Sequence, residues 1–215
     1  MSEFFNSNDH LQSILRPFGP TIMKFTLPDA LILDFNAACD EISKSEELKN
    51  KLDFSNYLVG KVRQEFLIPD NVIDKHLTYF YNCLGVYYKF MFESGLTKKE
   101  KTEAKKLSGW FVRSFAGDFN PCHVHNGCNM SCVGYLKLPD WAEEKKIDAQ
   151  DNCPCVGLID FIYGSVTPMQ RHNWAVEPKI GDFYLFPSNL VHTVYPFKSN
   201  GERRSFSINF NLSLE

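Results

Sequence analysis

Three histidines have the spacing and surroundings expected of ligands to one metal ion. His123 and His125 are separated by one residue in "CHVHNG", and His192 lies far downstream in "PSNLVHTVYPF". In a strand, residues two apart point to the same side, so the first two side chains would share a face. Apolar and polar residues alternate around His192, which predicts an inward side chain. A lone inward histidine is most often a packed core residue, but three together favour a metal site.

A structural zinc site is a competing interpretation, because Cys122 and Cys128 flank the first two histidines. The spacing differs from the paired CxxC and HxxxH ligands of common zinc sites. Adjacent Cys122 and His123 would also point to opposite faces of a strand. We therefore favour the three-histidine site. The other histidines are interpreted as structural or surface residues: His10, His76 and His172.

The stretch "RRSFSINFNLSL" near the end of the chain alternates polar and apolar residues, as a strand with two different faces does. Its polar face lies either in water or along a pocket. In the second case Arg203 and Ser205 would bind an anion, because a planar guanidinium binds a carboxylate through two parallel hydrogen bonds. Arg204 shares the apolar face, so we expect it to pair at the outer surface.

Composition limits the function classes. The chain has 215 residues, of which 44% are hydrophobic and 23% charged, as in one globular domain. A net charge of −3 argues against nucleic acid as a partner. No apolar run approaches the roughly 18 residues that cross a bilayer, and "MSEFFNSNDH" lacks the pattern of a secretory signal, so we expect a cytoplasmic protein without a membrane partner. Seven irregularly spaced cysteines argue for reduced thiols.

The hydrophobic pattern changes near residue 105. Residues 1–105 are mainly helical in pattern, and residues 106–215 have the short aromatic or β-branched stretches of strands. The expected helices cover 28–43 and 69–95, and the polar, basic stretch 96–106 is a solvated helix or linker. The expected strands cover 109–117, 131–139, 155–164, 181–187, 190–197 and 203–214. This order predicts one mainly β domain over 1–215, a jelly roll with N-terminal helices packed on it.

These motifs, in this order, resemble the 2-oxoglutarate- and Fe(II)-dependent oxygenases, in particular a branch common in bacteria and phages. The pattern of that branch runs H-x-H, then S-G-V-Y-Y-L, then G-D with F-P-S-x-L-x-H-x-V-x-P, and finally R-x-S-x-S-x-N. The matching stretches here are "HVHNGCNMSCVGYLKLP", "GDFYLFPSNLVHTVYPF" and "RRSFSINFN". Order and spacing agree across about residues 105–215, and the helical first part carries little of the resemblance.

The resemblance implies a double-stranded β-helix with Fe(II) in its mouth, and 2-oxoglutarate and O2 as cosubstrates. His123 and His192 would bind the iron. Arg203 and Ser205 would hold the distal carboxylate of 2-oxoglutarate, with Tyr135 adding a hydroxyl. The implied reaction is hydroxylation of a substrate with formation of succinate and CO2.

The third metal ligand departs from the usual pattern of the superfamily, which is H-x-D or H-x-E. Here residue 125 is a histidine, and three neutral ligands would bind Fe(II) more weakly at low pH. Two alternatives stay open. His125-Asn126-Gly127 matches the H-x-G of carrier-dependent halogenases, or a carboxylate such as Asp118 or Asp160 completes the site. We favour His123, His125 and His192, because the count from His123 to Tyr135 fits the branch pattern.

Several questions stay open at this point. The substrate is a protein side chain, a small molecule or, less favoured by the net charge, a nucleobase. Residues 161–174, with Arg171 and Trp174, are a candidate loop over the mouth. The rival functions are a three-histidine dioxygenase that does not use 2-oxoglutarate and a non-enzymatic jelly-roll binding or structural module. The oligomeric state is undetermined, although the aromatic helices allow a homodimer. A phage-encoded chain would work in the host cytoplasm.

Overall fold

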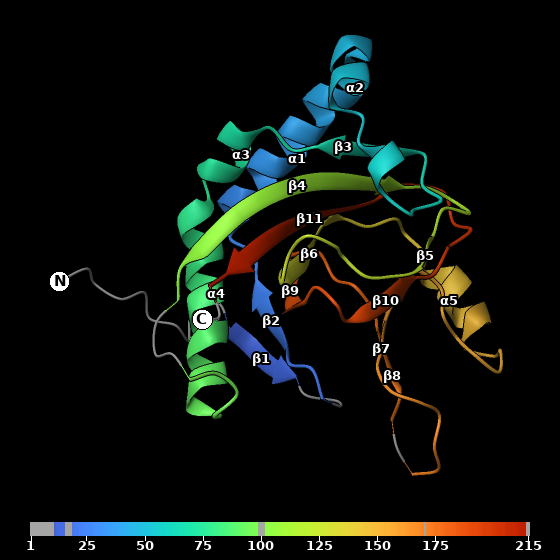
Figure 1. Ribbon diagram of the computed structural model, residues 1–215. Helices are drawn as coiled ribbons and strands as arrows, with labels where there is room; N and C mark the ends of the chain where they lie inside the picture. Colours follow the sequence, from blue (N-terminus) through green and yellow to red (C-terminus); the bar gives the residue numbers. More distant parts are fainter. Residues whose placement is uncertain (1–10, 16–18, 99–101, 170, 214–215) are drawn as a thin grey trace.

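Two antiparallel sheets, one large and one small, form the body of the protein (Figure 1). The computed structural model describes residues 11–15, 19–98, 102–169 and 171–213. The large sheet has the strand order β1 (Leu11–Leu15), β2 (Ile22–Thr26), β9 (Asp182–Pro187), β6 (Met130–Lys137), β11 (Arg203–Leu212), β4 (Ala104–Ser114) and β3 (Gln64–Leu67). The small sheet has the order β5 (Asn120–His123), β10 (Val191–Val194), β7 (Ile159–Ile162) and β8 (Asn173–Val176). This is the jelly roll that the sequence predicts.

The helices cover the outer face of the large sheet (Figure 1). They are α1 (Asp29–Lys44), α3 (Asp70–Asp74) and α4 (Leu77–Glu93). Helix α2 (Glu46–Leu52) projects past the β3 edge of the sheet, and α5 (Ala142–Asp148) lies beside the small sheet. Helix α1 buries Phe35, whose ring centroid lies 4.9 Å from that of Phe206 on β11. Phe80 of α4 packs on the same ring at 6.1 Å. Apolar residues spaced three and four apart therefore fix these helices against the apolar face of β11.

A second apolar cluster fills the space between the two sheets. It joins Tyr184 and Phe186 of β9 to Ile159 and Phe161 of β7. Since β-sheet side chains alternate, β11 presents Phe206 to the helices and its polar residues to this inner space. The large sheet thus packs against the helices on one face and borders a partly polar interior on the other.

Gly134 shows how closely the strands of the large sheet are packed. It pairs with Phe206, and a Cβ at Gly134 would lie 2.3 Å from that aromatic ring. Any side chain at this position would displace the ring that both helices contact.

The first part of the chain is less helical than its pattern predicts. Strands β1, β2 and β3 were not expected. In the large sheet, β2 pairs with β9 and β3 pairs with β4, and β1 joins the sheet by pairing with β2. The expected helix 69–95 is two helices, because His76 lies outside helical geometry and its Nε2 contacts Asp34 Oδ2 at 2.7 Å. Short strands of this kind depend on long-range pairing, which local pattern does not encode.

Two further boundaries differ from expectation. Within the described part of 96–106 there is no helix, and residues from Ala104 onward belong to β4, where they pair with β11. In the expected strand 155–164, β7 begins at Ile159, after a turn in which Gly157 has φ +66°. His10 lies outside the described residues. None of the helices in the described ranges is long and apolar enough to cross a membrane.

Glu202 is the acid in a buried ion-pair network at the start of β11. Its carboxylate accepts hydrogen bonds from Arg113 Nε at 2.6 Å and Arg204 Nε at 2.8 Å. Burial alone would raise the pKa of Glu202, but these two guanidinium groups outweigh it and hold the pKa at about 2. The ionised form therefore stabilises the fold at neutral pH.

We expect Glu202→Gln to lower the free energy of unfolding at pH 7 by about 3 kcal/mol, since it leaves buried cations short of an anion. A lowered pKa contributes stability above the unfolded-state value near 4.5 and loses it as pH falls toward 2. Urea unfolding at pH 7, 5 and 3 should therefore show a deficit that shrinks below pH 4.5. Glu47→Gln, at an exposed position, is the control. A deficit that persists unchanged at pH 3 contradicts the ion-pair explanation.

Candidate functional site

Strand pairing brings the three predicted histidines together. His192 on β10 is the direct partner of His123 on β5, and their ring centroids lie 4.3 Å apart. His125 follows β5 and is anchored by its backbone N–H, which donates to the carbonyl of Ser188 at 2.9 Å. One nitrogen of each ring lies within 4.8 Å of the others. His125 therefore reaches the group from a loop, and strand alternation, on which the sequence argument rested, does not place it.

Each imidazole has its Nδ1 beside an oxygen atom. His123 Nδ1 lies 2.7 Å from the carbonyl of Pro121, and His192 Nδ1 lies 2.8 Å from the carbonyl of Leu190. Carbonyl oxygens only accept, so both Nδ1 atoms carry the hydrogen and both Nε2 atoms keep a free lone pair. For His125, Nδ1 faces the side-chain oxygen of Asn209 at 3.0 Å.

The Nε2 atoms lie close together. His125 Nε2 and His192 Nε2 are 3.3 Å apart, a separation at which both can bind one cation. Bonds of about 2.1 Å from one metal at right angles would set two nitrogens about 3 Å apart. Oxygens that hold Nδ1–H are also the usual outer support of metal-bound histidines. The donor set therefore fits a first-row divalent metal such as Fe(II).

Burial keeps the histidines in the form that binds metals. It lowers the pKa of His192 to about 3, with His123 and His125 adding repulsion. It lowers the pKa of His125 to about 4, and that of His123 in the same direction. Neutral imidazoles are required of ligands, so no proton has to be removed at neutral pH.

Neither carboxylate considered as an alternative third ligand belongs to this group. Asp118 accepts hydrogen bonds from the backbone N–H groups of Phe115 and Arg63, at 2.9 and 3.3 Å. Asp160 accepts from the side chains of Asn173 and Tyr195, at 3.0 and 3.3 Å. Within the described residues, the histidines form one group of three without either aspartate.

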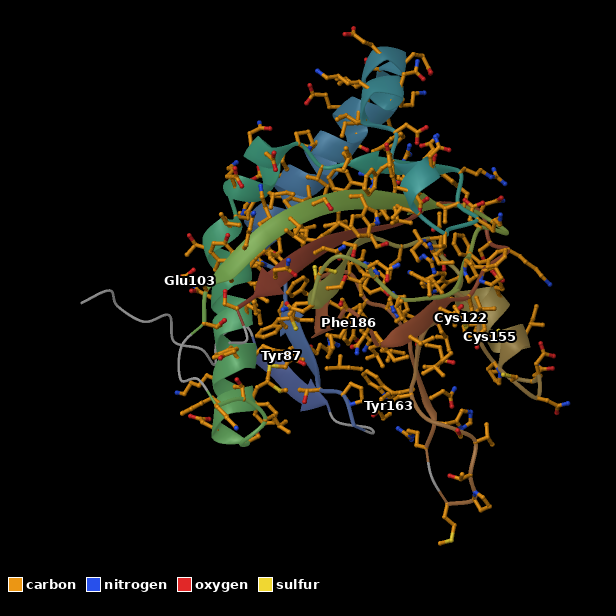
Figure 2. The ribbon with its side chains drawn as sticks, in the orientation of Figure 1. Tyr87, Glu103, Cys122, Cys155, Tyr163 and Phe186 are labelled. Carbon is orange, nitrogen blue, oxygen red and sulfur yellow. The ribbon has the colours of Figure 1, made fainter. Side chains whose placement is uncertain are left out.

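The cysteines beside the histidines are also outside the group. Cys122 is exposed at the edge of the small sheet (Figure 2), and Cys128 is half-buried with its Sγ on the carbonyl of His125 at 3.9 Å. Phe186 instead lies against the metal-ligand candidates, with its ring centroid 5.1 Å from that of His192. The structural zinc interpretation therefore lacks its two sulfur ligands.

A cavity of about 310 Å³ connects the histidines to the polar face of β11. Arg203 lies in its wall and is 2% exposed. Its guanidinium donates to Ser114 Oγ at 3.1 Å and to the carbonyls of Gly157 and Tyr195, both at 3.4 Å. Among the described residues it has no carboxylate partner within ion-pair distance, and burial lowers its pKa. A buried, unpaired cation costs several kcal/mol, which an anion in the cavity would offset.

Ser205 and Tyr135 are direct cross-strand partners, and both line the same cavity. Arg204 points the other way. Its guanidinium donates to Glu202 at 2.8 Å and to Asp40 at 2.7 Å, on the helical side of the sheet. The two neighbouring arginines therefore face opposite sides of the sheet, as the alternation predicts, and Arg203 faces the cavity without an acid. Arg204 does not pair at the outer surface as expected: it is 2% exposed, because α1 covers that face of the sheet and supplies Asp40.

The loop expected over the mouth lies elsewhere. Trp174 on β8 stacks on Phe161, with ring centroids 5.9 Å apart, and does not line the cavity of the histidines. Arg171 lines a separate hollow at the tip of the β7–β8 hairpin. The expectation that residues 161–174 cover the site is therefore not supported by the cavity lining.

A different segment, around Phe54 and Tyr57, lines the outer part of the cavity, and no sequence motif indicates it. Tyr57, which is 78% exposed, stacks on Phe54 at 5.1 Å between ring centroids. Phe54 packs on Trp110 at 5.7 Å, and Trp110 stacks on His125 at 5.5 Å. This row of rings, the aromatic wall, leads from solvent to the histidines. Its first members, Phe54 and Tyr57, lie at the two ends of a short 3-10 helix, η1 (Ser55–Tyr57), whose sequence has neither periodicity nor a motif.

Glu65 on β3 is a further cavity residue that sequence reasoning missed. It is 1% exposed, and neither carboxylate oxygen has a hydrogen-bond partner among the described residues. Burial raises the pKa of Glu65 to about 7. The nearby amide of Asn120 favours the ionised form and lowers this pKa only in part, because it does not form a well-aligned hydrogen bond with the carboxylate. The carboxyl thus costs stability when it is ionised.

We expect Glu65→Gln to stabilise the protein at pH 8 by about 1–3 kcal/mol. A raised pKa makes the ionised native state less favourable above the unfolded-state value near 4.5, and the penalty grows until pH passes about 7. Urea unfolding should therefore show no gain at pH 4 and a full gain at pH 8. Glu103→Gln is the control, since Glu103 is exposed at the far end of β4 from the cavity (Figure 2). A destabilised Glu65→Gln variant at pH 8 contradicts this expectation.

Comparison with known families and structures agrees with this geometry. Residues 108–209 match the model of a family described as "Putative 2OG-Fe(II) oxygenase". A search of curated protein sequences found no match.

Solved structures show the same fold at low identity. A prolyl-4-hydroxylase from Pseudomonas putida is 17% identical with a TM-score of 0.55, over 88% of this chain and 91% of that one. A prolyl hydroxylase from Trichoplax adhaerens, in complex with a hypoxia inducible factor peptide fragment, is 12% identical with a TM-score of 0.55, over 88% and 83%. The carbocyclase SnoK of nogalamycin biosynthesis is 13% identical with a TM-score of 0.56, over 88% and 78%.

Proposed function

We propose a residue-level assignment for this chain, which belongs to the 2-oxoglutarate- and Fe(II)-dependent oxygenase superfamily and acts with Fe(II), 2-oxoglutarate and O2. His123, His125 and His192 hold Fe(II) through their Nε2 atoms. Arg203, Ser205 and Tyr135 hold the distal carboxylate of 2-oxoglutarate. The observation that carries this assignment is the buried, unpaired guanidinium of Arg203 in the cavity that the histidines also line.

The protein's own groups have three tasks in this reaction. The oxygens on each Nδ1 fix the imidazole tautomer and orientation. Arg203 orients the cosubstrate by charge and geometry. Phe161 and Phe186 pack against His192 and exclude water from that side. When bound, Fe(II) with 2-oxoglutarate and O2 supplies the oxidising power for hydroxylation of the substrate, with formation of succinate and CO2.

Family membership disfavours the two rival functions. A dioxygenase that does not use 2-oxoglutarate has no need of Arg203, and a binding module has no need of three convergent lone pairs. The proposal includes that the prime substrate is a small molecule or a protein side chain. A phage origin and a cytoplasmic location stay predictions.

An anaerobic titration tests the assignment. The full chain is titrated with Fe(II) and then 2-oxoglutarate, while the visible charge-transfer band of a metal-chelated 2-oxo acid is followed. We expect the band to appear, to require both additions, and to be unchanged in Arg171→Ala, whose residue lines the separate hairpin hollow. Iron binding without a band would overturn the Arg203 assignment. Failure to bind iron would overturn the histidine assignment.

A further inference from the structure

Glu65 faces the cavity from the sheet position that continues the row of Ser205 and Tyr135. Glu65 pairs with Val112 on β4, Val112 pairs with Ser205 on β11, and Ser205 pairs with Tyr135 on β6. Direct partners in an antiparallel sheet point to the same side. Glu65 and Ser205 are two strands apart, which is about 10 Å. The carboxyl therefore serves a different part of the cavity from the proposed cosubstrate subsite.

That part of the cavity lies toward solvent and is largely apolar. The aromatic wall runs along it, and exposed Tyr57 and Val59 line its outer end. Glu65 and Asn120 are the polar groups that meet there. A Cβ placed on Gly60 would lie 2.7 Å from both Glu65 Oε1 and Asn120 Nδ2, so the two side chains converge on one point.

The charges around Glu65 do not explain it as a structural residue. Asp53 and Asp118 add like charge, and the Asn120 amide is the nearby group that favours ionised Glu65. No described lysine, arginine or histidine pairs with it. The neighbouring cations pair with other acids: Arg63 with Asp118, and Arg113 and Arg204 with Glu202. A carboxyl that lowers stability, faces a cavity and has no cation of its own fits a ligand that brings the cation.

We propose that Glu65, with the Asn120 amide beside it, binds a positively charged nitrogen of the prime substrate, an ammonium or guanidinium group. The apolar part of the substrate packs along the aromatic wall toward the histidines. The prime substrate is accordingly an organic cation or the side chain of a basic residue. This inference rests on the proposed function and adds the substrate class. The cavity then has complementary ends, with Arg203 for the anionic cosubstrate and Glu65 for the cationic substrate.

Binding of simple probes tests the charge requirement. The full chain, loaded with Zn(II) and 2-oxoglutarate, is titrated with n-butylammonium and with 1-butanol, and ¹³C NMR follows the Glu65 carboxyl. We expect n-butylammonium to bind at least about tenfold more tightly than the alcohol and to lower the pH at which Glu65 titrates. Equal affinity for the two probes, or an unmoved Glu65 titration, overturns the proposal.

Variants test whether Glu65 is responsible for the preference for the ammonium over the alcohol. Glu65→Gln should lose the preference for the ammonium, and Gly60→Ala, whose new methyl group displaces the carboxyl, should weaken it without changing Glu65 itself. Glu103→Gln should keep it. A preference that survives Glu65→Gln assigns the cation to another site and overturns the proposal. Comparison of n-butylammonium with Nα-acetyl-lysine amide distinguishes a small organic amine from a lysine side chain flanked by peptide groups.

The failure of this inference is distinguishable from the failure of the proposed function. Fe(II) and 2-oxoglutarate should give the same visible band in wild type and Glu65→Gln, because Glu65 is assigned to neither group. A band without ammonium preference rejects the cationic substrate and leaves the oxygenase assignment. Ammonium preference without a band rejects the cosubstrate assignment and leaves the cation site.

Discussion

Replacing His192 with alanine is expected to abolish Fe(II) binding at micromolar metal and, with it, all turnover of 2-oxoglutarate. His192 is 4% exposed, and its Nε2 lies 3.3 Å from that of His125, so it supplies one of three convergent lone pairs. Removing an outer hydrogen-bond partner of a metal ligand typically costs about 10–100-fold in affinity. Loss of the ligand itself should exceed that range.

The measurement is calorimetric titration of the full chain with Fe(II) under argon, with 2-oxoglutarate consumption as a second readout. His172→Ala is the matched control, because His172 lines the hairpin hollow away from the cavity. It should bind iron like wild type. Thermal unfolding of both variants shows whether they are folded. A folded His192→Ala variant with unchanged iron affinity would remove His192 from the metal site.

Replacing Arg203 and replacing Arg204 are expected to have opposite effects on 2-oxoglutarate affinity and on the free energy of unfolding. Arg203→Met should reduce the affinity for 2-oxoglutarate by about 30-fold or more, since truncating one partner of a buried charge pair costs about 2–5 kcal/mol. Its stability without cosubstrate should be unchanged or higher, because a buried cation without a carboxylate partner is replaced by an apolar side chain of similar length.

Arg204→Met should behave in the reverse manner. It removes the guanidinium that bridges Glu202 and Asp40, so the free energy of unfolding should fall by about 3 kcal/mol. The folded fraction should bind 2-oxoglutarate like wild type, because Arg204 points to the helical side of the sheet. Urea unfolding and 2-oxoglutarate titration of both variants make a paired test. Loss of cosubstrate affinity in Arg204→Met, with Arg203→Met unaffected, would reverse the assignment.

The sequence by itself determined which residues of β11 share a face. Side chains of a strand alternate between its two faces. Arg203, Ser205 and Asn209 therefore share one face and Arg204 lies on the other, which follows without any tertiary information. The same rule placed His192 inward on β10, and the run of short strands in the second half indicated a jelly roll.

Tertiary structure decided everything that depends on pairing between distant segments. His125 stands past the end of β5, and its anchor is the carbonyl of Ser188, which no local pattern reveals. Asp118 and Asp160 were acceptable ligands by residue type, but the fold gives them other partners and leaves them outside the histidine group. Glu65 reaches the cavity because β3 pairs with β4. Periodicity sets the side of a strand on which a residue lies, but the free energy of long-range packing sets what faces it.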